Sequence, residues 1–285
     1  MRRKRGLPMA KGTIRVLSSA ISWGLRTGKF DLLKVNPAKD LGMATPDPRV
    51  RFASRLELDT LIAVADHVGR HDMGDSFVAA VWSGQRQGDR LHLQEQEELR
   101  DTLICKQSKT GEIVQIPIAP QFQSRRAAAS FRRQQAGVVS NQLILFENQW
   151  KPFKADNYRH LFGDIRRVAV NGLWRAPDGQ LVCPVNDGFR YLKNVKARAV
   201  SGTCLVKPCR SLADFQEADF RDTAVTWLGL AGATVPEICA VTGHSPQSAT
   251  QVLRHYLAMH PEMAKSAISK MVAWYDADGE TEIKI

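Results

Sequence analysis

The sequence of 285 residues predicts a mainly α-helical fold of the α+β class, with one small antiparallel β-sheet. Apolar residues recur at helical spacing through most of the chain, and strand-like alternation is confined to about residues 100–118. Hydrophobic residues make up 44% and charged residues 24% of the chain, which is typical of a globular protein.

The first helix is expected over residues 12–28, because apolar residues recur every three or four positions from Ile14 to Leu25. The Asn-Pro pair at 36–37 ends this region, since proline cannot continue a helix. Residues 43–53 are rich in proline and polar residues, which predicts a linker.

Ser54 and Glu57 have the spacing of a capping box, so a helix is expected to begin directly after Ser54. A further helix is expected over about 75–83. Two strand-like runs between 100 and 118 flank the Lys-Thr-Gly sequence at 109–111, which predicts a β-hairpin with its turn there.

The helical pattern returns after the hairpin. Residues 171–214 are poorly patterned, and no element is assigned to them. Six helices are expected, at about residues 120–136, 155–169, 221–231, 235–241, 246–256 and 261–273.

The chain carries a strong excess of positive charge, with a formal net charge of +11 and a pI of about 9.6. Residues 1–50 hold eleven Lys or Arg and three Asp. This balance favours a polyanionic partner, most simply nucleic acid; a solvated basic tail, RNA and anionic lipid are the alternatives. No apolar run approaches the roughly 20 residues of a bilayer span, and no secretory signal follows the basic N-terminus, so a cytoplasmic protein is expected.

The five cysteines are expected to be reduced thiols of an intracellular protein. Their number is odd, their spacing is irregular, and no C-x-x-C pair occurs, so the sequence predicts no zinc site. The cysteines are Cys105, Cys183, Cys204, Cys209 and Cys239.

Four short segments carry residues suited to phosphate chemistry. Arg86 lies in the glycine-flanked turn SGQRQGD, and arginine binds phosphate oxygens in a bidentate manner. Lys109 lies at the hairpin turn, and Arg221 opens an apolar helix in FRDTA. His244 lies in TGHS, and Tyr256 follows one further helix in RHY. Each segment by itself is more typical of a solvated turn, a helix start or a packed residue.

The order of these five residues resembles the catalytic domain of the tyrosine recombinases, in particular the phage-type integrases of bacteria. That family has an Arg in a T-G-x-R-x-G-[DE] turn, a Lys in a β-hairpin, then H-x-x-R, [LT]-G-H and Tyr. The segments SGQRQGD, QSKTGE, FRDTAVTWL and EICAVTGHS are similar to it throughout. Residues 165–169 resemble the helix before the third block, and the resemblance covers about residues 50–275.

The resemblance implies a site-specific DNA recombinase that cleaves and rejoins DNA through a 3′-phosphotyrosyl bond, without metal ion, ATP or other cofactor. Tyr256 would be the nucleophile, and Arg86 and Arg221 would clamp the non-bridging phosphate oxygens. His244 would donate a further hydrogen bond, and Lys109 would protonate the leaving 5′-oxygen.

The same resemblance implies partners and a cellular place. Double-stranded DNA would be bound by a homotetramer, with accessory DNA-bending proteins, at the nucleoid of a bacterial or phage-infected cell. The helix after Tyr256 has an apolar stripe, which would pack either on its own domain or on a neighbouring protomer.

Four segments follow from the resemblance. Residues 1–42 would be a partial helical core-binding domain, 43–53 a linker, 54–275 the catalytic domain and 276–285 a C-terminal tail. The Asn-Pro-Ala sequence at 36–38 is similar to the end of the family's core-binding domain. The chain is therefore expected to be N-terminally short, as in a truncated gene, a late start or a degraded prophage copy.

Ala218 is a departure from the family, because it stands where the pattern has histidine three residues before the second arginine. Alanine offers no imidazole to bond a phosphate or accept a proton. A catalytically impaired DNA-binding remnant is therefore the alternative function. A type IB topoisomerase, which acts as a monomer without site preference, is a third interpretation.

Tyr256 is chosen as the nucleophile over the three other tyrosines. The interval from His244 to Tyr256 is longer than in many relatives, but one subgroup of integrases has this form, with a basic residue before the tyrosine. Tyr275 falls in the expected tail, and Tyr158 and Tyr191 precede the second arginine.

Overall fold

A computed structural model describes residues 2–30, 32–44, 49, 51–95, 101–200, 202–256 and 261–276. Side chains are described at these positions except at 2–5, 255–256 and 261–263. The chain divides into two compact units, Met1–Val50 and Arg51–Ile285, and each is described by itself.

The first unit contains helix α1 (Arg2–Arg26) and the segment that folds back along it. The helix is interrupted at Gly6, whose φ of 75° and ψ of 167° are not helical, so its continuous part begins after Gly6 with Pro8 in the first turn, still before the expected residue 12. Asn36 is buried and fixes the return of the chain: its Nδ2 donates to the Ser18 carbonyl and to Ser22 Oγ, both at 2.8 Å. The Asn-Pro pair, where the first region was predicted to end, thus contains a buried asparagine that is hydrogen-bonded to α1.

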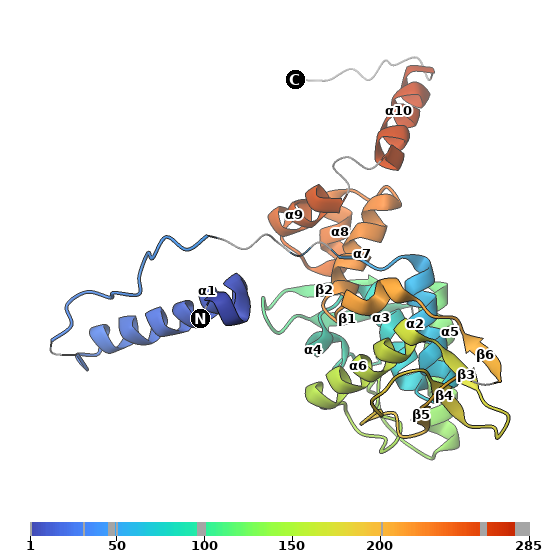
Figure 1. Ribbon diagram of the computed structural model, residues 1–285. Coiled ribbons are helices and arrows are strands. Elements are labelled where there is room, and N and C mark those ends of the chain that lie inside the picture. The colour runs from blue at the N-terminus through green and yellow to red at the C-terminus, as the bar shows by residue number, and fades with distance from the viewer. Residues whose placement is uncertain are drawn as a thin grey trace. The chain divides into compact units, whose positions relative to one another are not determined.

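The second unit is mainly helical and contains two small sheets (Figure 1). Within it, α7, α8 and α9 pack on one another, and α8 also contacts β2. Its elements are α2 (Arg55–His67), α3 (His71–Ser83), α4 (Gln87–Arg90), β1 (Thr102–Lys106), β2 (Ile113–Pro117), α5 (Pro120–Gln135), α6 (Ala155–Asn171), β3 (Leu173–Arg175), β4 (Leu181–Cys183), β5 (Val195–Ala197), β6 (Thr203–Val206), the 3₁₀ helix η1 (Arg210–Asp214), α7 (Asp219–Leu230), α8 (Val235–Thr242), α9 (Pro246–Tyr256) and α10 (Pro261–Asp276).

The predicted capping box at the start of α2 is confirmed. Ser54 Oγ accepts from the Glu57 amide at 3.2 Å, and the Glu57 carboxylate accepts from the Ser54 amide at 2.8 Å. Arg51 adds an ion pair to Glu57 at 2.6 Å, so the start of the unit is tied to its first helix. These bonds satisfy amide groups that no carbonyl within the helix can reach.

The predicted hairpin is confirmed as β1 and β2, which pair antiparallel. Leu103 lies opposite Ile116 and Cys105 opposite Val114, and these four side chains are buried. Gly111 has a φ of 77°, which the turn requires and which side chains with a Cβ rarely adopt. The buried side chains of the two strands therefore anchor the hairpin that carries the 107–111 turn.

A second sheet, with strand order β5-β4-β3-β6, lies in residues 171–214, to which the sequence assigned no element. The sequence predicted one sheet, whereas the described residues form two. The strands are three or four residues long, which is too short for an alternating pattern to stand out. β4 and β5 pair in parallel, so this sheet is mixed.

An aromatic cluster in the main core supports the start of α7. Phe220 stacks on Phe77 with ring centroids 5.3 Å apart and meets Phe215 edge to face at 5.0 Å. Phe162 contacts the same ring at 5.9 Å. Because Phe220 is fully buried, the next residue along the helix, Arg221, has its backbone fixed by the core.

Two further findings concern the cysteines and the described helices. All five cysteines are free thiols. Of the helices that the structure describes, none combines the length and apolar character that crossing a membrane requires.

Candidate active site

Three of the predicted site residues meet in the second unit. Arg86 precedes α4, Arg221 lies in the first turn of α7, and His244 lies between α8 and α9. Arg221 connects them: its Nη1 donates to the Gly84 carbonyl at 2.5 Å, and its Nε donates to His244 Nε2 at 3.2 Å. Arg86, Arg221 and Ala218 line one pocket of about 370 Å³.

A left-handed glycine lets the Arg86 turn approach the end of α8. Gly84 ends α3 with a φ of 62°. A Cβ at this position would lie 2.7 Å from Thr242 Cγ2, closer than side chains tolerate. The glycine before Arg86 is therefore required by both backbone conformation and close packing.

Of the predicted site cations, Arg221 has the most deeply buried side chain. Its side chain is almost fully buried, and burial, followed by the positive charge of Arg86, lowers its pKa to about 10. The guanidinium is still charged at neutral pH. Its Nη2 is buried and donates to no acceptor among the atoms that the structure describes. A buried cationic donor without an acceptor is costly, so this geometry is suited to binding an anion.

His244 is neutral at pH 7, because burial, then Arg221 and Arg86, lower its pKa to about 4. Its Nδ1 lies 2.9 Å from Thr242 Oγ1, and that hydroxyl donates to the Ile238 carbonyl at 2.7 Å. The network therefore assigns the ring proton to Nδ1, leaving Nε2 to accept from Arg221. In this arrangement His244 orients Arg221, and a hydrogen bond from His244 to a phosphate stays a prediction.

The low pKa of His244 makes stability depend on pH. The unfolded state protonates this histidine below about pH 6.5, whereas the folded state does so only near pH 4. The His244 contribution to stability therefore falls as pH drops from about 6.5 to 4. We expect His244→Gln to lose less free energy of unfolding between pH 7 and pH 4.5 than the parent chain, measured by urea denaturation.

Asp75 provides the control with the opposite sign. Burial raises its pKa to about 6, so the folded state binds a proton first and gains stability as pH falls through the same window. Asp75→Asn should therefore lose more stability than the parent chain between the two pH values. Equal pH dependence of the parent and His244→Gln would contradict the assignment of a neutral, buried His244.

Lys109 and Tyr256 were predicted to join this site. Lys109 is exposed in the turn of the β1–β2 hairpin and does not line the pocket. The hairpin itself is tied to the Arg86 turn, because the Ser108 amide donates to buried Asp89 at 2.9 Å. Tyr256 is the last residue of α9, and its side chain lies outside the described residues.

The other tyrosines have different surroundings. Tyr158 is fully buried, and burial raises its pKa to about 12, so it is a poor nucleophile. Tyr191 stacks on the His160 ring with centroids 4.8 Å apart. Tyr275 is 75% exposed on α10.

Sequence reasoning missed several residues that support the site. Arg90 has 1% of its surface exposed and forms an ion pair with Glu217 at 2.5 Å. It also donates to Tyr158 at 2.8 Å and to Ser76 at 3.1 Å. Glu217 directly precedes Ala218, so the ion pair between Arg90 and Glu217 anchors the wall of the pocket.

Gln107 is a second supporting residue that the sequence did not indicate. It is fully buried and accepts from Arg86 at 2.8 Å. A glutamine beside a turn and a second arginine in a polar segment both look solvated in sequence, so no local signal indicates them.

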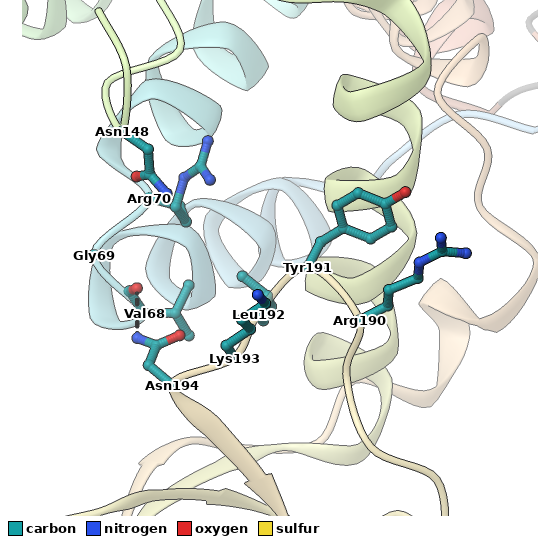
Figure 2. A pocket seen from close by; sticks show the side chains of 9 residues that line it. All are labelled: Val68, Gly69, Arg70, Asn148, Arg190, Tyr191, Leu192, Lys193 and Asn194. Atoms are coloured by element: carbon teal, nitrogen blue, oxygen red, sulfur yellow. Dashed lines mark hydrogen bonds between the residues drawn. The ribbon is translucent and has the colours of Figure 1, made fainter.

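A larger pocket, of about 680 Å³, opens between the α2–α3 junction and residues 190–194 (Figure 2). Asn194 Nδ2 donates to the Val68 carbonyl at 2.9 Å across it. Arg70 lines the pocket but is held by Asp72 at 2.9 and 2.6 Å. None of the four predicted site residues whose side chains are described lines it, so the candidate site is the smaller pocket.

The fold is that of the tyrosine recombinase catalytic domain, as the sequence predicted. A lambda integrase tetramer bound to a Holliday junction matches 84% of this chain and 57% of its own, with a TM-score of 0.53 and 16% identity. The Tn1549 transposon integrase in complex with circular intermediate DNA matches 94% of this chain and 81% of its own, with a TM-score of 0.57 and 16% identity.

XerA recombinase matches 82% of this chain and 70% of its own, with a TM-score of 0.50 and 14% identity. The chain spans little more than half the length of the lambda integrase it matches. No protein-family model and no curated protein sequence matches the chain.

Proposed function

We propose that the chain is a site-specific DNA recombinase that cleaves and rejoins duplex DNA through a 3′-phosphotyrosyl bond at Tyr256. The observation that carries the proposal is the buried Arg221, whose Nη2 has no acceptor among the described atoms and whose neighbours are Arg86 and neutral His244. Two arginines that line one pocket are suited to the two non-bridging oxygens of a phosphodiester.

The reaction is a transesterification. The Tyr256 oxygen attacks phosphorus, the P–O5′ bond breaks, and the phosphate gains negative charge on its non-bridging oxygens. Arg221 and Arg86 stabilise that charge, and His244 holds Arg221 through its Nε. A free phenol has a pKa of about 10, so Tyr256 must pass its proton to solvent water as it attacks. Lys109 supplies a proton to the leaving 5′-oxygen.

The bond energy of the cleaved strand is kept in the phosphotyrosyl ester. The free 5′-hydroxyl of a second strand attacks this ester and releases Tyr256, so neither ATP nor another cofactor is required. Duplex DNA is accordingly the proposed partner. We further propose that the chain acts as a homotetramer on two duplexes, together with accessory DNA-bending proteins, and that it is located at the nucleoid.

A catalytically impaired DNA-binding protein is the second candidate. Ala218 lines the same pocket as Arg86 and Arg221, and it presents a methyl group where the family pattern has imidazole. The pocket therefore lacks, at residue 218, a hydrogen-bond donor that an imidazole would provide. Both candidates bind DNA, and they differ in whether a covalent bond forms.

The test is covalent trapping. The protein is incubated with a suicide duplex nicked near the host attachment core, so that cleavage releases a short strand and rejoining is blocked. We expect a denaturant-stable protein–DNA adduct whose DNA-linked peptide contains Tyr256. Tyr256→Phe should give none, because phenylalanine has no nucleophilic oxygen.

The readouts separate the candidates. An adduct that maps to Tyr256 supports the recombinase. DNA binding without an adduct in the parent chain, together with adduct formation by Ala218→His, supports the impaired protein. An adduct that persists in Tyr256→Phe contradicts the assignment of the nucleophile.

A further inference from the structure

Gln107 lies where the β1–β2 hairpin meets the rest of the second unit, and its side chain is fully buried. Its Oε1 accepts from Arg86 Nη1 at 2.8 Å and from the Thr110 hydroxyl at 3.1 Å. Its Nε2 donates to Gln85 Oε1 and to the Thr242 carbonyl, both at 2.7 Å. One carboxamide thus makes four hydrogen bonds to three different segments.

The backbone of Gln107 closes the hairpin turn as well. Its amide donates to the Glu112 carbonyl at 2.8 Å, and its carbonyl accepts from the Gly111 amide at 2.8 Å. Lys109 lies between these bonds, two residues after Gln107. The same residue therefore fixes the turn that carries Lys109 and the side chain of Arg86.

A second buried glutamine extends the network to α8. Gln85 Nε2 donates to the Ser83 carbonyl at 2.9 Å and to the Val241 carbonyl at 3.0 Å, and its Oε1 accepts from Gln107. The two side chains lie between the turn before Arg86 and the end of α8, which leads into His244.

Close packing leaves little freedom at this junction. Gly243 has a φ of 64°, and a Cβ there would lie 2.3 Å from Gln107 Nε2. The α8 end can therefore approach the carboxamide only because residue 243 has no side chain. The fit is specific for an amide: a carboxylate has no donor for Thr242, and Lys or Arg has no acceptor for Arg86.

We propose that Gln107 is a positioning residue, which holds Arg86, the Lys109 turn and the His244 loop in one arrangement through its carboxamide. The inference rests on the proposed function. Gln107 does not face the pocket that Arg86 and Arg221 line, so its effect on the reaction passes through the groups it holds. A displacement of such groups by about 1 Å lowers rates by as much as about 10²-fold.

The first test uses Gln107→Met, which preserves side-chain length and removes all four hydrogen bonds. The rate of adduct formation is measured on the suicide duplex at saturating protein, together with DNA affinity and melting temperature. We expect the rate to fall by about 10- to 100-fold. DNA affinity should change little, because phosphate contacts along the duplex provide most of it.

Gln142→Met is the matched control. Gln142 is a half-buried glutamine of the same unit, and its Nε2 donates to the Leu91 carbonyl at 2.5 Å without bonding any of the three site segments. We expect it to lower the melting temperature without changing the adduct rate. If Gln107→Met and Gln142→Met lower the rate equally, Gln107 has only a structural role and the proposal is wrong.

A second readout does not depend on activity. Gln107 bonds the carbonyl of Thr242, whose hydroxyl contacts His244 Nδ1. Release of this loop should expose the imidazole, so the pKa of His244 should rise in Gln107→Met, as measured by NMR titration of the ring. In Gln142→Met it should stay at the parent value. An unchanged pKa in Gln107→Met would overturn the positioning role.

These outcomes separate the two proposals. A parent chain that forms no adduct contradicts the proposed function, whereas the His244 titration still decides the role of Gln107. If Gln107→Met does not fold, Gln85→Met removes the outer half of the network and is read by the same two measurements. It should reduce the adduct rate more than Gln142→Met does.

Discussion

Arg221→Gln should lower the rate of covalent adduct formation by about 10²–10³-fold, the scale of losing one preorganised donor to a developing oxyanion. The charge on the phosphate increases during attack, so a fixed cation stabilises the transition state more than the bound substrate. Arg221 is fixed before DNA arrives, because Gly84 and His244 already hold two of its nitrogens. The measurement is a single-turnover time course on the suicide duplex.

Arg166→Gln is the matched control for this prediction. Arg166 is a half-buried arginine on α6 whose Nη1 donates to the Phe215 carbonyl at 2.6 Å, and it does not line the pocket. Its replacement removes the same charge and a similar hydrogen bond, so the adduct rate should stay near that of the parent chain. A rate for Arg221→Gln equal to that of Arg166→Gln would show that Arg221 does not act on the reacting phosphate.

Glu217→Gln is expected to lower the free energy of unfolding by about 3–5 kcal/mol, because it leaves Arg90 buried without its carboxylate partner. Arg90 is one of the most deeply buried side chains of the described structure, with 1% of its surface exposed, so water cannot replace the lost charge. Tyr158 and Ser76 still accept its hydrogen bonds but carry no charge. Urea denaturation at pH 7 measures the change.

The matched control is Asp178→Asn. Asp178 pairs with Arg198 at 2.7 Å, but both side chains are more than 40% exposed, so solvent screens the pair. Solvent-exposed ion pairs contribute little to stability, so Asp178→Asn should lose much less free energy of unfolding than Glu217→Gln. Equal losses for Glu217→Gln and Asp178→Asn would contradict the assignment of Arg90–Glu217 as a stabilising buried pair.

Local patterns in the sequence were sufficient for the elements that depend on neighbouring residues. The capping box at Ser54 and the hairpin around Gly111 follow from short-range geometry, and the structure has both. The strands of residues 173–206 could not be predicted, since each has three or four residues and its stability comes from pairing with distant segments.

The candidate site also has residues that local motifs predict and residues that they do not. Motifs predicted Arg86, Arg221 and His244, and the structure brings these three together. The residues that hold them act over long sequence distances. Gln107 bonds a carbonyl 135 positions away, and Arg90 pairs with a carboxylate 127 positions away. Such contacts have no local pattern, because the partner is set by the tertiary fold.

The large sequence separation between Gln107 and Thr242 also affects when the site can assemble during synthesis of the chain. The ribosome delivers the chain from its N-terminus, and long-range contacts form only after both partners have emerged. The turn that carries Arg86 is synthesised well before the loop that carries His244. A nascent chain that ends before residue 242 therefore lacks the Thr242 carbonyl that accepts from the Gln107 carboxamide, and it has no imidazole to hold Arg221. The candidate site of Arg86, Arg221 and His244 can therefore be assembled only after residue 244 has emerged, whereas the first unit can fold well before that point.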